Sequence, residues 1–455
     1  MDYDLETIAS LAKRRGFIYQ GSEIYGGLAG TWDYGPLGIS LKRNLINMWW
    51  KFFVEDRQDM LGIDSATLMN SKVWQASGHV ATFNDPLIED VVTKKRYRLD
   101  QLLEDNGVNV EDMDLATMVA VAKEKNIKSP DGNDLENPGQ FNLMFKSHIG
   151  PLEDENSLVY LRPETAQGMF VNFKNVLDSF YPDIPFGLAQ VGRSYRNEIS
   201  PRDFIFRVRE LEIMEFEYFI HPNDWEKYFN TLHDLMNEWF TKVLHFSPEH
   251  IHERELPENN RAHYSKRTID FEYDFPIGHK EIAGLSYRTD FDLKNHQEKS
   301  MQNMEYRPKN GDLAFIPHVI EPTFGVDRHI LAILCEAYSQ DEINGEKRFF
   351  LKFPFEIAPI KLAVFPLLKN KPELIAKAQS IYQQLHKKFG QVMWDDNGNI
   401  GKRYRRQDEI GTPYCVTIDF QSLQDDTFTL RDRDTTIQER MKIDQLISKL
   451  ESQAS

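Results

Sequence analysis

The chain has 455 residues, of which 41% are hydrophobic and 27% charged, so it is long enough for two or three domains with a large core. Its formal net charge of -17 argues against a protein that coats nucleic acid nonspecifically, but a structured RNA could still be bound by local basic patches. No apolar run has the length that crossing a bilayer requires, and the N-terminus lacks a signal-peptide core, which predicts a cytoplasmic protein without membrane contact.

The first predicted elements are a short helix over residues 1–15 and, after a glycine-rich segment, a long apolar helix. Six apolar residues, which we call the apolar stripe, recur along the long helix at helical spacing: Leu41, Leu45, Met48, Trp49, Phe52 and Phe53. Burial within the same domain and a subunit interface both explain such a stripe. Periodicity alone slightly favours burial.

Two later segments look like insertions. Residues 99–150 are helical and acidic and contain a turn-rich loop, and residues 222–263 carry a second helical stretch before strands resume. Two basic clusters, residues 94–98 and 402–406, could contact RNA. A single cluster of this kind is more often a solvated face.

The segment from Gly187 to Tyr218 is predicted to form an antiparallel hairpin with a long loop. Its two arms, Gly187–Arg196 and Leu211–Tyr218, alternate like strands, and the residues between them are too many and too charged for a tight turn. Guanidinium groups bind phosphate oxygens bidentately, so arginines at the strand ends, beside Glu198 and Glu215, can grip phosphate and ammonium groups together. An arbitrary basic loop would more often be a solvated surface loop.

Residues 318–338 are predicted to form a strand that runs into a helix, with Gly325 before the helix and Arg328 in its first turn. An arginine at that position lies at the unfavourable end of the helix dipole unless it holds an anion, which argues against a purely structural role. From about residue 350, strands and helices alternate, which predicts a separate α/β domain. The expected domains are therefore residues 1–349 and 350–455.

Five blocks carry a resemblance to a known family: RPETAQGMF, GRSYRNEISPRDFIFRVRE, AHYSKRTIDFEYDFP, EIAGLSYRTDFDL and EPTFGVDR. Their order and spacing make the chain similar, over almost its whole length, to the homodimeric class II glycyl-tRNA synthetases. The resemblance implies an α+β catalytic domain, with an antiparallel sheet flanked by helices and helical insertions, followed by a C-terminal α/β anticodon-binding domain. The hairpin becomes motif 2, EPTFGVDR with its helix motif 3, and the long helix motif 1, which would move the apolar stripe from the core to a dimer interface.

The resemblance also implies an activity, that of a cytoplasmic, homodimeric ligase that activates glycine with ATP and Mg²⁺ and transfers it to tRNA(Gly). By analogy, Arg196 clamps the α-phosphate and the substrate carboxylate, Arg207 reaches the outer phosphates, and Arg328 approaches the γ-phosphate. Arg196 and Arg328 are the implied catalytic residues, Glu198 would contact the adenine end, and Glu281 would help to hold ATP through Mg²⁺. The implied ATP-binding set is Arg196, Asn197, Glu198, Phe206, Arg207, Val208, Arg209, Glu210, Leu211, Glu281, Ile282, Gly325, Val326, Asp327 and Arg328.

Glycine has no side chain to recognise, so its site must grip the ammonium and exclude bulk. Glu164 and Glu215 match the ammonium-binding positions, with Thr323 beside them, and Arg98 matches a further arginine that contacts the substrate. Steric closure around the α-carbon would reject alanine. The implied glycine-binding set is Arg98, Glu164, Leu211, Glu212, Ile213, Met214, Glu215, Glu321, Pro322, Thr323, Phe324 and Gly325.

Three features depart from the family's usual pattern. Many relatives have zinc-binding cysteines where this chain has residues 129–132, and a further cysteine pair before Arg98, so we predict no structural zinc. Leu211 stands where a phenylalanine usually stacks on adenine, which leaves Phe206 as an alternative source of that contact. Thr323 replaces a serine, so it keeps the hydroxyl and adds a methyl group to a crowded site.

In the C-terminal domain, Tyr404, Arg405, Arg431 and Arg433 could stack on and bind unstacked anticodon bases. Their aromatic and guanidinium groups are of the kinds that hold single-stranded RNA.

Two alternative functions remain. A catalytically inactive class II synthetase-like binding module would be expected to lose the phosphate-binding arginines, which this chain keeps. A related synthetase for threonine, proline or histidine is the other alternative. A threonine enzyme would be expected to use metal-ligand Cys or His residues, and RPETAQGMF points to glycine rather than proline or histidine.

Overall fold

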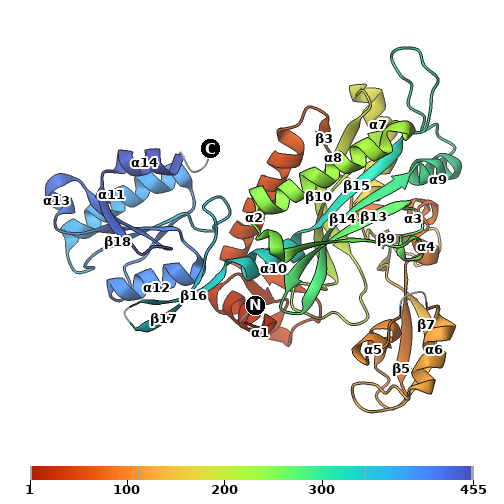
Figure 1. Ribbon diagram of the computed structural model, residues 1–455, viewed down its shortest axis with the longest axis horizontal. Helices are drawn as coiled ribbons and strands as arrows, with labels where there is room; N and C mark the ends of the chain where they lie inside the picture. The colour runs from red at the N-terminus through yellow and green to blue at the C-terminus, as the bar shows by residue number, and fades with distance from the viewer. Residues whose placement is uncertain (1–2, 111–112, 344, 452–455) are drawn as a thin grey trace.

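A seven-stranded sheet forms the centre of the larger domain in the computed structural model, which describes residues 3–110, 113–343 and 345–451 (Figure 1). Its strands are β3 (Met60–Gly62), β10 (Phe186–Tyr195), β11 (Glu210–Ile220), β12 (Ile251–Glu255), β13 (Arg267–Phe275), β14 (Gly278–Thr289) and β15 (His318–Gly325). The strand order is β12-β13-β14-β15-β11-β10-β3, and all neighbours are antiparallel except β10 and β3. The predicted antiparallel sheet is therefore confirmed.

The predicted hairpin is formed by β10 and β11. The two strands pair from Phe186 opposite Phe219 to Tyr195 opposite Glu210, and β11 pairs on its other side with β15. Residues 196–209 form the long loop at the open end. The hairpin thus occupies the interior of the sheet, where both of its strands have neighbours on each side.

Helices cover both faces of the sheet (Figure 1). One face carries α2 (Pro36–Trp50) with the π-helical segment Lys51–Glu55, α8 (Trp225–Glu238) with the π-helical segment Trp239–Val243, and α10 (Val326–Ala337). The other face carries α7 (Ala166–Phe180) and α9 (Phe291–Ser300). Successive residues of β11 supply both layers, since Met214 and Phe216 pack in the first and Phe219 in the second.

The apolar stripe lies in the core, so the dimer interface implied by the resemblance is wrong for its central residues. Leu41, Leu45, Trp49 and Phe53 are fully buried within the single chain, and Met48 and Phe52 are partly buried against the same core. The rings of Trp49 and Phe53 lie 5.1–6.2 Å from those of Phe216 and Phe324. The apolar face of β11 and β15 covers the stripe, which helical periodicity could not distinguish from a partner subunit.

The helix predicted within residues 222–263 is also part of the main core. Phe229, Leu232 and Met236 of α8 are buried in the cluster that holds the apolar stripe. The end of this stretch, β12, forms the edge strand of the main sheet. These residues therefore belong to the body of the domain.

The earlier insertion is a small module with its own core, which projects from the domain at the lower right of Figure 1. It comprises β5 (Asn84–Asp90), β6 (Arg96–Arg98), α5 (Leu99–Asp105), α6 (Leu115–Glu124) and β7 (Leu135–Asn142). We call these elements the insertion module. It begins before residue 99 because β5 is the central strand and pairs with both β6 and β7.

Acidic neighbours neutralise the basic cluster at residues 94–98. Lys94 lies 2.8 Å from Glu136, and Lys95 lies 2.8 Å from Asp131. Such pairs favour a solvated surface over an RNA contact at the two lysines.

Hydrogen bonds hold the turn at residues 129–132, the segment where we predict no structural zinc. The side chains of Ser129 and Asn133 donate to the carboxylate of Asp90, which also accepts from the backbone N–H groups of Val92 and Thr93. Asp90 thus organises this turn through side-chain and backbone bonds. The absence of zinc stays a prediction.

Smaller elements complete the larger domain. Asp4 caps α1 by accepting from the backbone N–H of Thr7, and the helix ends at Gly16, whose φ of 77° suits glycine. The elements are α1 (Leu5–Arg15), β1 (Ile18–Gln20), β2 (Trp32–Tyr34), β4 (Leu68–Met69), α3 (Ser71–Ala76), α4 (His79–Thr82), β8 (Lys146–His148) and β9 (Leu158–Leu161).

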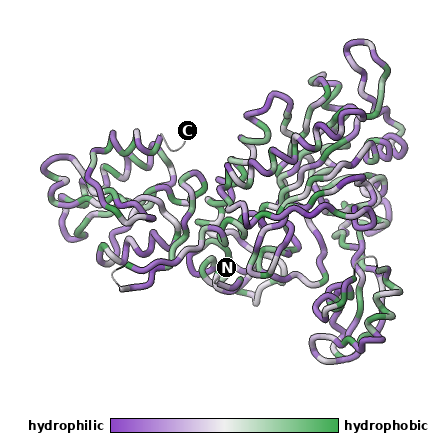
Figure 2. The backbone as a smooth tube through the Cα atoms, in the orientation of Figure 1, coloured by the Kyte–Doolittle hydropathy of each residue, from purple (hydrophilic) through white to green (hydrophobic). Residues whose placement is uncertain are grey.

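The C-terminal domain is a five-stranded sheet with helices, as predicted, and a ribbon of β16 (Tyr338–Ile343) and β17 (Glu346–Leu351) precedes it. Its elements are β18 (Leu362–Pro366), α11 (Pro372–Phe389), β19 (Val392–Trp394), α12 (Ile400–Ile410), β20 (Tyr414–Ile418), α13 (Ser422–Asp425), β21 (Phe428–Asp432), β22 (Gln438–Met441) and α14 (Ile443–Glu451). The strand order is β19-β18-β20-β21-β22, and hydrophobic residues recur along the central strands (Figure 2). Among the described helices of the whole chain, none is long and apolar enough to cross a membrane.

Three of the four residues expected to contact anticodon bases point into this domain instead. Arg431 and Arg433 are buried, where Arg431 pairs with Asp408 at 2.7 Å and Arg433 donates to the carbonyl of Gly411 at 2.8 Å. The hydroxyl of Tyr404 bonds that of Thr417. The prediction is wrong for Arg431 and Arg433, because their charges serve an internal network. Tyr404 and Arg405 are partly exposed, and their contact with RNA stays a prediction.

Replacing Trp49 by alanine should lower the free energy of unfolding of the larger domain by about 3–5 kcal/mol, because it leaves a cavity among fully buried rings. Urea unfolding followed by tryptophan fluorescence and circular dichroism measures this loss. The neighbouring half-buried Trp50 is the control, and its replacement should cost clearly less. A Trp49→Ala protein of unchanged stability would contradict the placement of the stripe in the core.

Candidate active site

A cavity of about 280 Å³ opens among the hairpin loop, β14, the start of α10 and the insertion module. It collects residues that are far apart in the sequence, and most of the predicted ATP-binding residues are among them. The predicted residues that line it are Arg98, Arg196, Glu198, Phe206, Arg207, Val208, Leu211, Glu212, Ile213, Glu281, Ile282, Thr323, Gly325, Asp327 and Arg328.

Arg196 and Glu198 enter the cavity directly after β10. The backbone N–H of Arg196 donates to the carbonyl of Arg209, which extends the hairpin pairing by one step, and Nε donates to the carbonyl of Pro163 at 3.2 Å. Glu198 is buried, and its Oε2 atom lies 4.0 Å from Nη1 of Arg98 without accepting a hydrogen bond. The Arg196 guanidinium is thus anchored at one nitrogen, and its other nitrogens are available to a ligand.

The side chain of Arg207 has a free donor that can bind an anion. Its Nη1 atom is buried and has no hydrogen-bond partner among the described residues. Burial, together with the nearby charge of Arg98, lowers the pKa of Arg207. A negatively charged ligand would relieve both effects, because it supplies an acceptor and an opposite charge.

Arg328, in the first turn of α10, faces Arg207 across the cavity wall formed by Phe206. Its Nη1 atom donates to the carbonyl and to the carboxylate of Glu281, both at 2.9 Å, and its guanidinium lies over the Phe206 ring, 4.5 Å from the centroid. The adjacent Asp327 accepts from the Tyr34 hydroxyl at 2.5 Å and from the backbone N–H of Glu212 at 3.0 Å. These bonds connect the start of α10 to β11 and β2, which fixes the position of the Arg328 backbone.

Behind the cavity lies a buried acidic cluster. Glu215 of β11 accepts from the hydroxyl of Thr165 at 2.5 Å and from that of Thr323 at 2.7 Å. Burial, reinforced by the charge of Glu164, raises the pKa of Glu215. Thr323 also lines the cavity, so its hydroxyl joins the open space to the cluster.

Arg288 supplies positive charge to this cluster. It is fully buried and donates to Glu321 at 2.7 Å and to both carboxylate oxygens of Asp292 at 2.8 and 2.9 Å. Glu164 lies 3.2 Å from His79 and 4.0 Å from Arg288. Although burial opposes it, the charges of His79 and Arg288 hold the pKa of Glu164 below its usual range. The cluster therefore keeps an ionised carboxylate in a site closed to solvent.

Several predicted residues have side chains outside the cavity, so any contact they make with a ligand there would come from the backbone. Arg209 donates to the carbonyls of Glu198 and Ala29, and Glu210 pairs with Arg193 at the surface. The backbone N–H of Asn197 donates to the carbonyl of Leu143. Three further predicted residues, Met214, Phe324 and Val326, are buried in the main core. Pro322 belongs to β15 and does not line the cavity.

Comparison with known proteins decides the family. The model for the tRNA synthetase class II core domain (G, H, P, S and T) matches residues 147–338, and the model for the anticodon binding domain matches residues 361–453. The glycine–tRNA ligase of Caldanaerobacter subterraneus subsp. tengcongensis is 47% identical, with 98% of each chain covered. This chain belongs to the glycine–tRNA ligase family. The family's ligase from Thermus thermophilus is 43% identical over 97% of each chain, and that from Staphylococcus aureus is 46% identical over 98%.

Membership of the glycine–tRNA ligase family confirms the predicted fold class, a class II catalytic core followed by an anticodon-binding domain. It also confirms that the chain is an aminoacyl-tRNA synthetase, and nothing in these relatives supports the inactive binding module.

Sequence reasoning missed several residues of this glycine–tRNA ligase family site. Phe83, Asp85 and Leu143 line the cavity from the insertion module and its flanks, and their local sequence carries no signal of this role. The sequence does indicate a role for Arg288, because it lies near the end of a strand with alternating residues and four residues before Asp292. His79 and Gln167 of the cluster are recognisable only from their contacts with Glu164.

Burial raises the pKa of Asp85 to about 6. The charge of Arg98, 2.9 Å away, opposes this rise in pKa, and the charge of Glu198 adds to it. Because the unfolded carboxyl ionises near its ordinary pKa of about 3.9, the folded protein loses stability as the pH rises from about 4 to about 6. Between pH 5 and pH 7, wild type should lose about 1 kcal/mol of unfolding free energy relative to Asp85→Asn. Parallel urea titrations of both proteins measure the difference in unfolding free energy. A difference that stays constant between pH 5 and pH 7 would contradict a raised pKa of Asp85.

Proposed function

We propose that this protein is a glycine–tRNA ligase that joins glycine to ATP, forming glycyl-adenylate and pyrophosphate, and then transfers glycine to the 3′ end of tRNA(Gly). One observation carries the proposal: three arginines on the cavity wall, Arg196, Arg207 and Arg328, lie in front of a buried acidic cluster. The three arginines suit a triphosphate, and the acidic cluster suits an ammonium group. The names of the similar proteins support glycine over threonine, proline or histidine.

Activation needs positioning and charge neutralisation rather than a base. A carboxylate oxygen of glycine, already ionised at neutral pH, attacks the α-phosphorus of ATP, and the bond to the bridging oxygen breaks as pyrophosphate leaves. Arg196 would hold the α-phosphate and the attacking carboxylate together, Arg207 the outer phosphates, and Arg328 the γ-phosphate. Holding reactants in line and neutralising developing charge can supply most of the acceleration of such a step.

The residues around the cavity fit ATP and Mg²⁺. Glu281 places a partly exposed carboxylate at the rim, beside Arg328, and oxygen ligands of this kind suit Mg²⁺ together with phosphates. When bound, Mg²⁺ would neutralise phosphate charge. The ring of Phe206, already stacked with one guanidinium, offers an aromatic surface for adenine where Leu211 lacks one.

Selection of glycine would follow from the closed end of the cavity. The ammonium would lie toward Glu215 and Glu164, beside the hydroxyl of Thr323, and Arg98 would contact the substrate from the insertion module. The threonine methyl group leaves less room at the α-carbon than the family's serine does. Steric exclusion of the added methyl group would therefore reject alanine.

The C-terminal domain would bind the anticodon of tRNA(Gly), which its match to an anticodon-binding model supports. Homodimerisation and a cytoplasmic location rest on the family resemblance. The buried stripe residues cannot supply the dimer contact, so other surfaces of the larger domain would form it.

ATP–pyrophosphate exchange, with glycine, alanine, serine, threonine and proline offered separately, tests the reaction and the amino acid together. We expect exchange with glycine alone. No exchange with any amino acid, from folded protein, would instead support the inactive binding module, and exchange with another amino acid would contradict the proposed substrate.

Replacing Arg328 by alanine should lower the glycine-dependent exchange rate by at least about 100-fold, because a cation that faces the phosphates is lost. Arg193→Ala is the control, on the β10–β11 hairpin rather than on α10, since Arg193 forms an exposed pair with Glu210 and its loss should change the rate by less than about twofold. Circular dichroism should show both variants folded. An unchanged rate in Arg328→Ala would exclude the role of Arg328.

A further inference from the structure

Glu217 differs from the other carboxylates of the acidic cluster. It is fully buried, and within the part of the chain that the structure describes neither of its carboxylate oxygens has a hydrogen-bond partner. By contrast, Glu215 accepts from two threonine hydroxyls, Glu321 accepts from Arg288, and Glu164 accepts from Gln167. A buried carboxylate without a donor is costly, so this group needs a partner from outside the chain or a proton.

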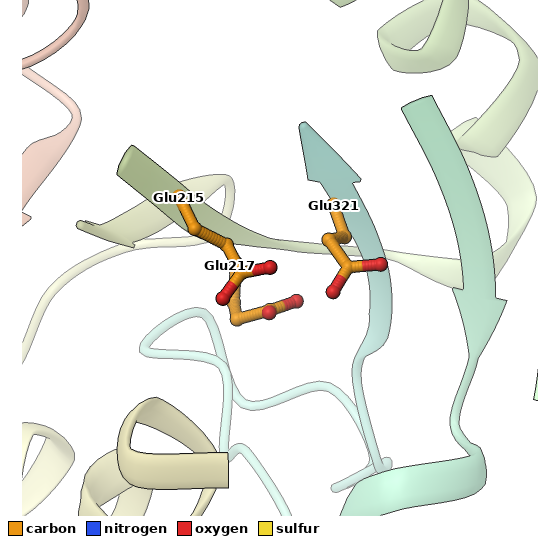
Figure 3. A group of neighbouring side chains, drawn as sticks. All are labelled: Glu215, Glu217 and Glu321. Atoms are coloured by element: carbon orange, nitrogen blue, oxygen red, sulfur yellow. The ribbon is translucent and has the colours of Figure 1, made fainter. Parts of the chain in front are cut away.

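The register of the sheet explains why Glu217 faces the cluster. Glu215 pairs with Thr323 and Tyr218 pairs with Ile320, which places Glu217 opposite Glu321 on the adjacent strand. Two residues apart on β11, Glu215 and Glu217 share one face. Figure 3 shows the carboxylates of Glu215, Glu217 and Glu321 turned toward one another, and one oxygen of each lies within 4.8 Å of the others.

We propose that Glu217 is a further carboxylate acceptor for the ammonium group of the amino acid substrate, beside Glu215, in the cluster that also holds Glu321 and Glu164. The inference rests on the proposed function, because it places the substrate ammonium in this cluster. An ammonium has three donors, and tetrahedral N–H···O bonds of about 2.8 Å place their acceptors roughly 4.6 Å apart. That spacing lies within the limit observed for the three oxygens.

The path to Glu217 runs along one face of β11. Leu211 and Ile213 line the cavity, and Glu215 and Glu217 follow on the same side of the strand. An amino acid that leads with its ammonium therefore meets Glu215 first and Glu217 deeper. Among the standard amino acids, glycine brings the least bulk to this end.

The local charges favour a cationic occupant. Arg288 bonds Asp292 and Glu321 and lies 4.0 Å from Glu164, and its charge also acts on Glu215 and Glu217. Burial, followed by the charge of Glu321, raises the pKa of Glu217, while Arg288 opposes the shift. An entering ammonium would favour the ionised form of Glu217 and release its proton, so glycine affinity should rise with pH while that proton is still bound.

The test is the Glu217→Gln variant, which keeps the shape and removes the charge. In ATP–pyrophosphate exchange, we expect its KM for glycine to rise roughly 10–100-fold, the cost of a lost hydrogen bond to a charged group, while the KM for ATP is unchanged. Glycolate, which carries a hydroxyl in place of the ammonium, serves as a competitive inhibitor, and its inhibition constant should not change. Glu336→Gln removes another partly buried carboxylate of the same domain, held by Ser247, His250 and Tyr273, and should leave the KM for glycine unchanged.

Three results would overturn the inference. An unchanged KM for glycine in Glu217→Gln would mean that Glu217 stays protonated or is occupied otherwise. An equal loss for glycine and glycolate would mean that the variant disturbs the site without touching the ammonium. Binding of Mn²⁺ by wild type but not by Glu217→Gln, measured by calorimetry without nucleotide and unaffected by glycine, would assign the cluster to a metal ion. If wild type shows no glycine-dependent exchange at all, the proposed function itself fails.

Discussion

The alternation of β11 is the constraint on which both the core and the site depend. Its pleat sends Met214 and Phe216 into the main core, where they meet the buried rings of α2, and sends Ile213 and Glu215 toward the cavity and the acidic cluster. A shift of one residue in pairing with β10 or β15 would turn the acids toward the apolar core and the apolar side chains toward the cavity. Packing of the core therefore fixes the register that assembles the site.

The acidic cluster is stabilised by a different balance. Arg288 binds Glu321 and Asp292 from a fully buried position, and the imidazole of His79 lies 3.2 Å from the carboxylate of Glu164. Ion pairs in such a place add little net stability, because desolvation offsets much of their attraction. Their effect is to orient the carboxylates and, at Glu164, to favour the ionised form, since the pKa of that carboxyl is held low. The cavity in front shows the converse arrangement, with Arg196, Arg207 and Arg328 in its lining and a buried Nη1 atom of Arg207 that lacks a partner among the described residues.

Local patterns predicted the parts of the site that lie within single elements. The alternation around Glu215 predicted the hairpin, and the sequence placed Arg328 in the first turn of a helix, where the structure has it at the cavity wall; its anion-binding role stays a prediction. Patterns could not predict which surface covers the apolar stripe, since a helix packs against a sheet and against a second subunit with the same periodicity. They also missed Asp85, because the insertion module brings it to the cavity only through the tertiary fold. Arg431 was assigned to RNA for its charge, yet it pairs with a buried aspartate.

The most direct test of this account is a crystal structure with a non-hydrolysable glycyl-adenylate analogue. The account predicts that the glycyl ammonium lies within hydrogen-bond distance of the Glu215 carboxylate, behind Thr323, and that the group in place of the α-phosphate lies against Arg196. An analogue bound in the reverse direction, with its ammonium toward Arg207 and Arg328, would contradict the separation of the site into a phosphate end and an ammonium end.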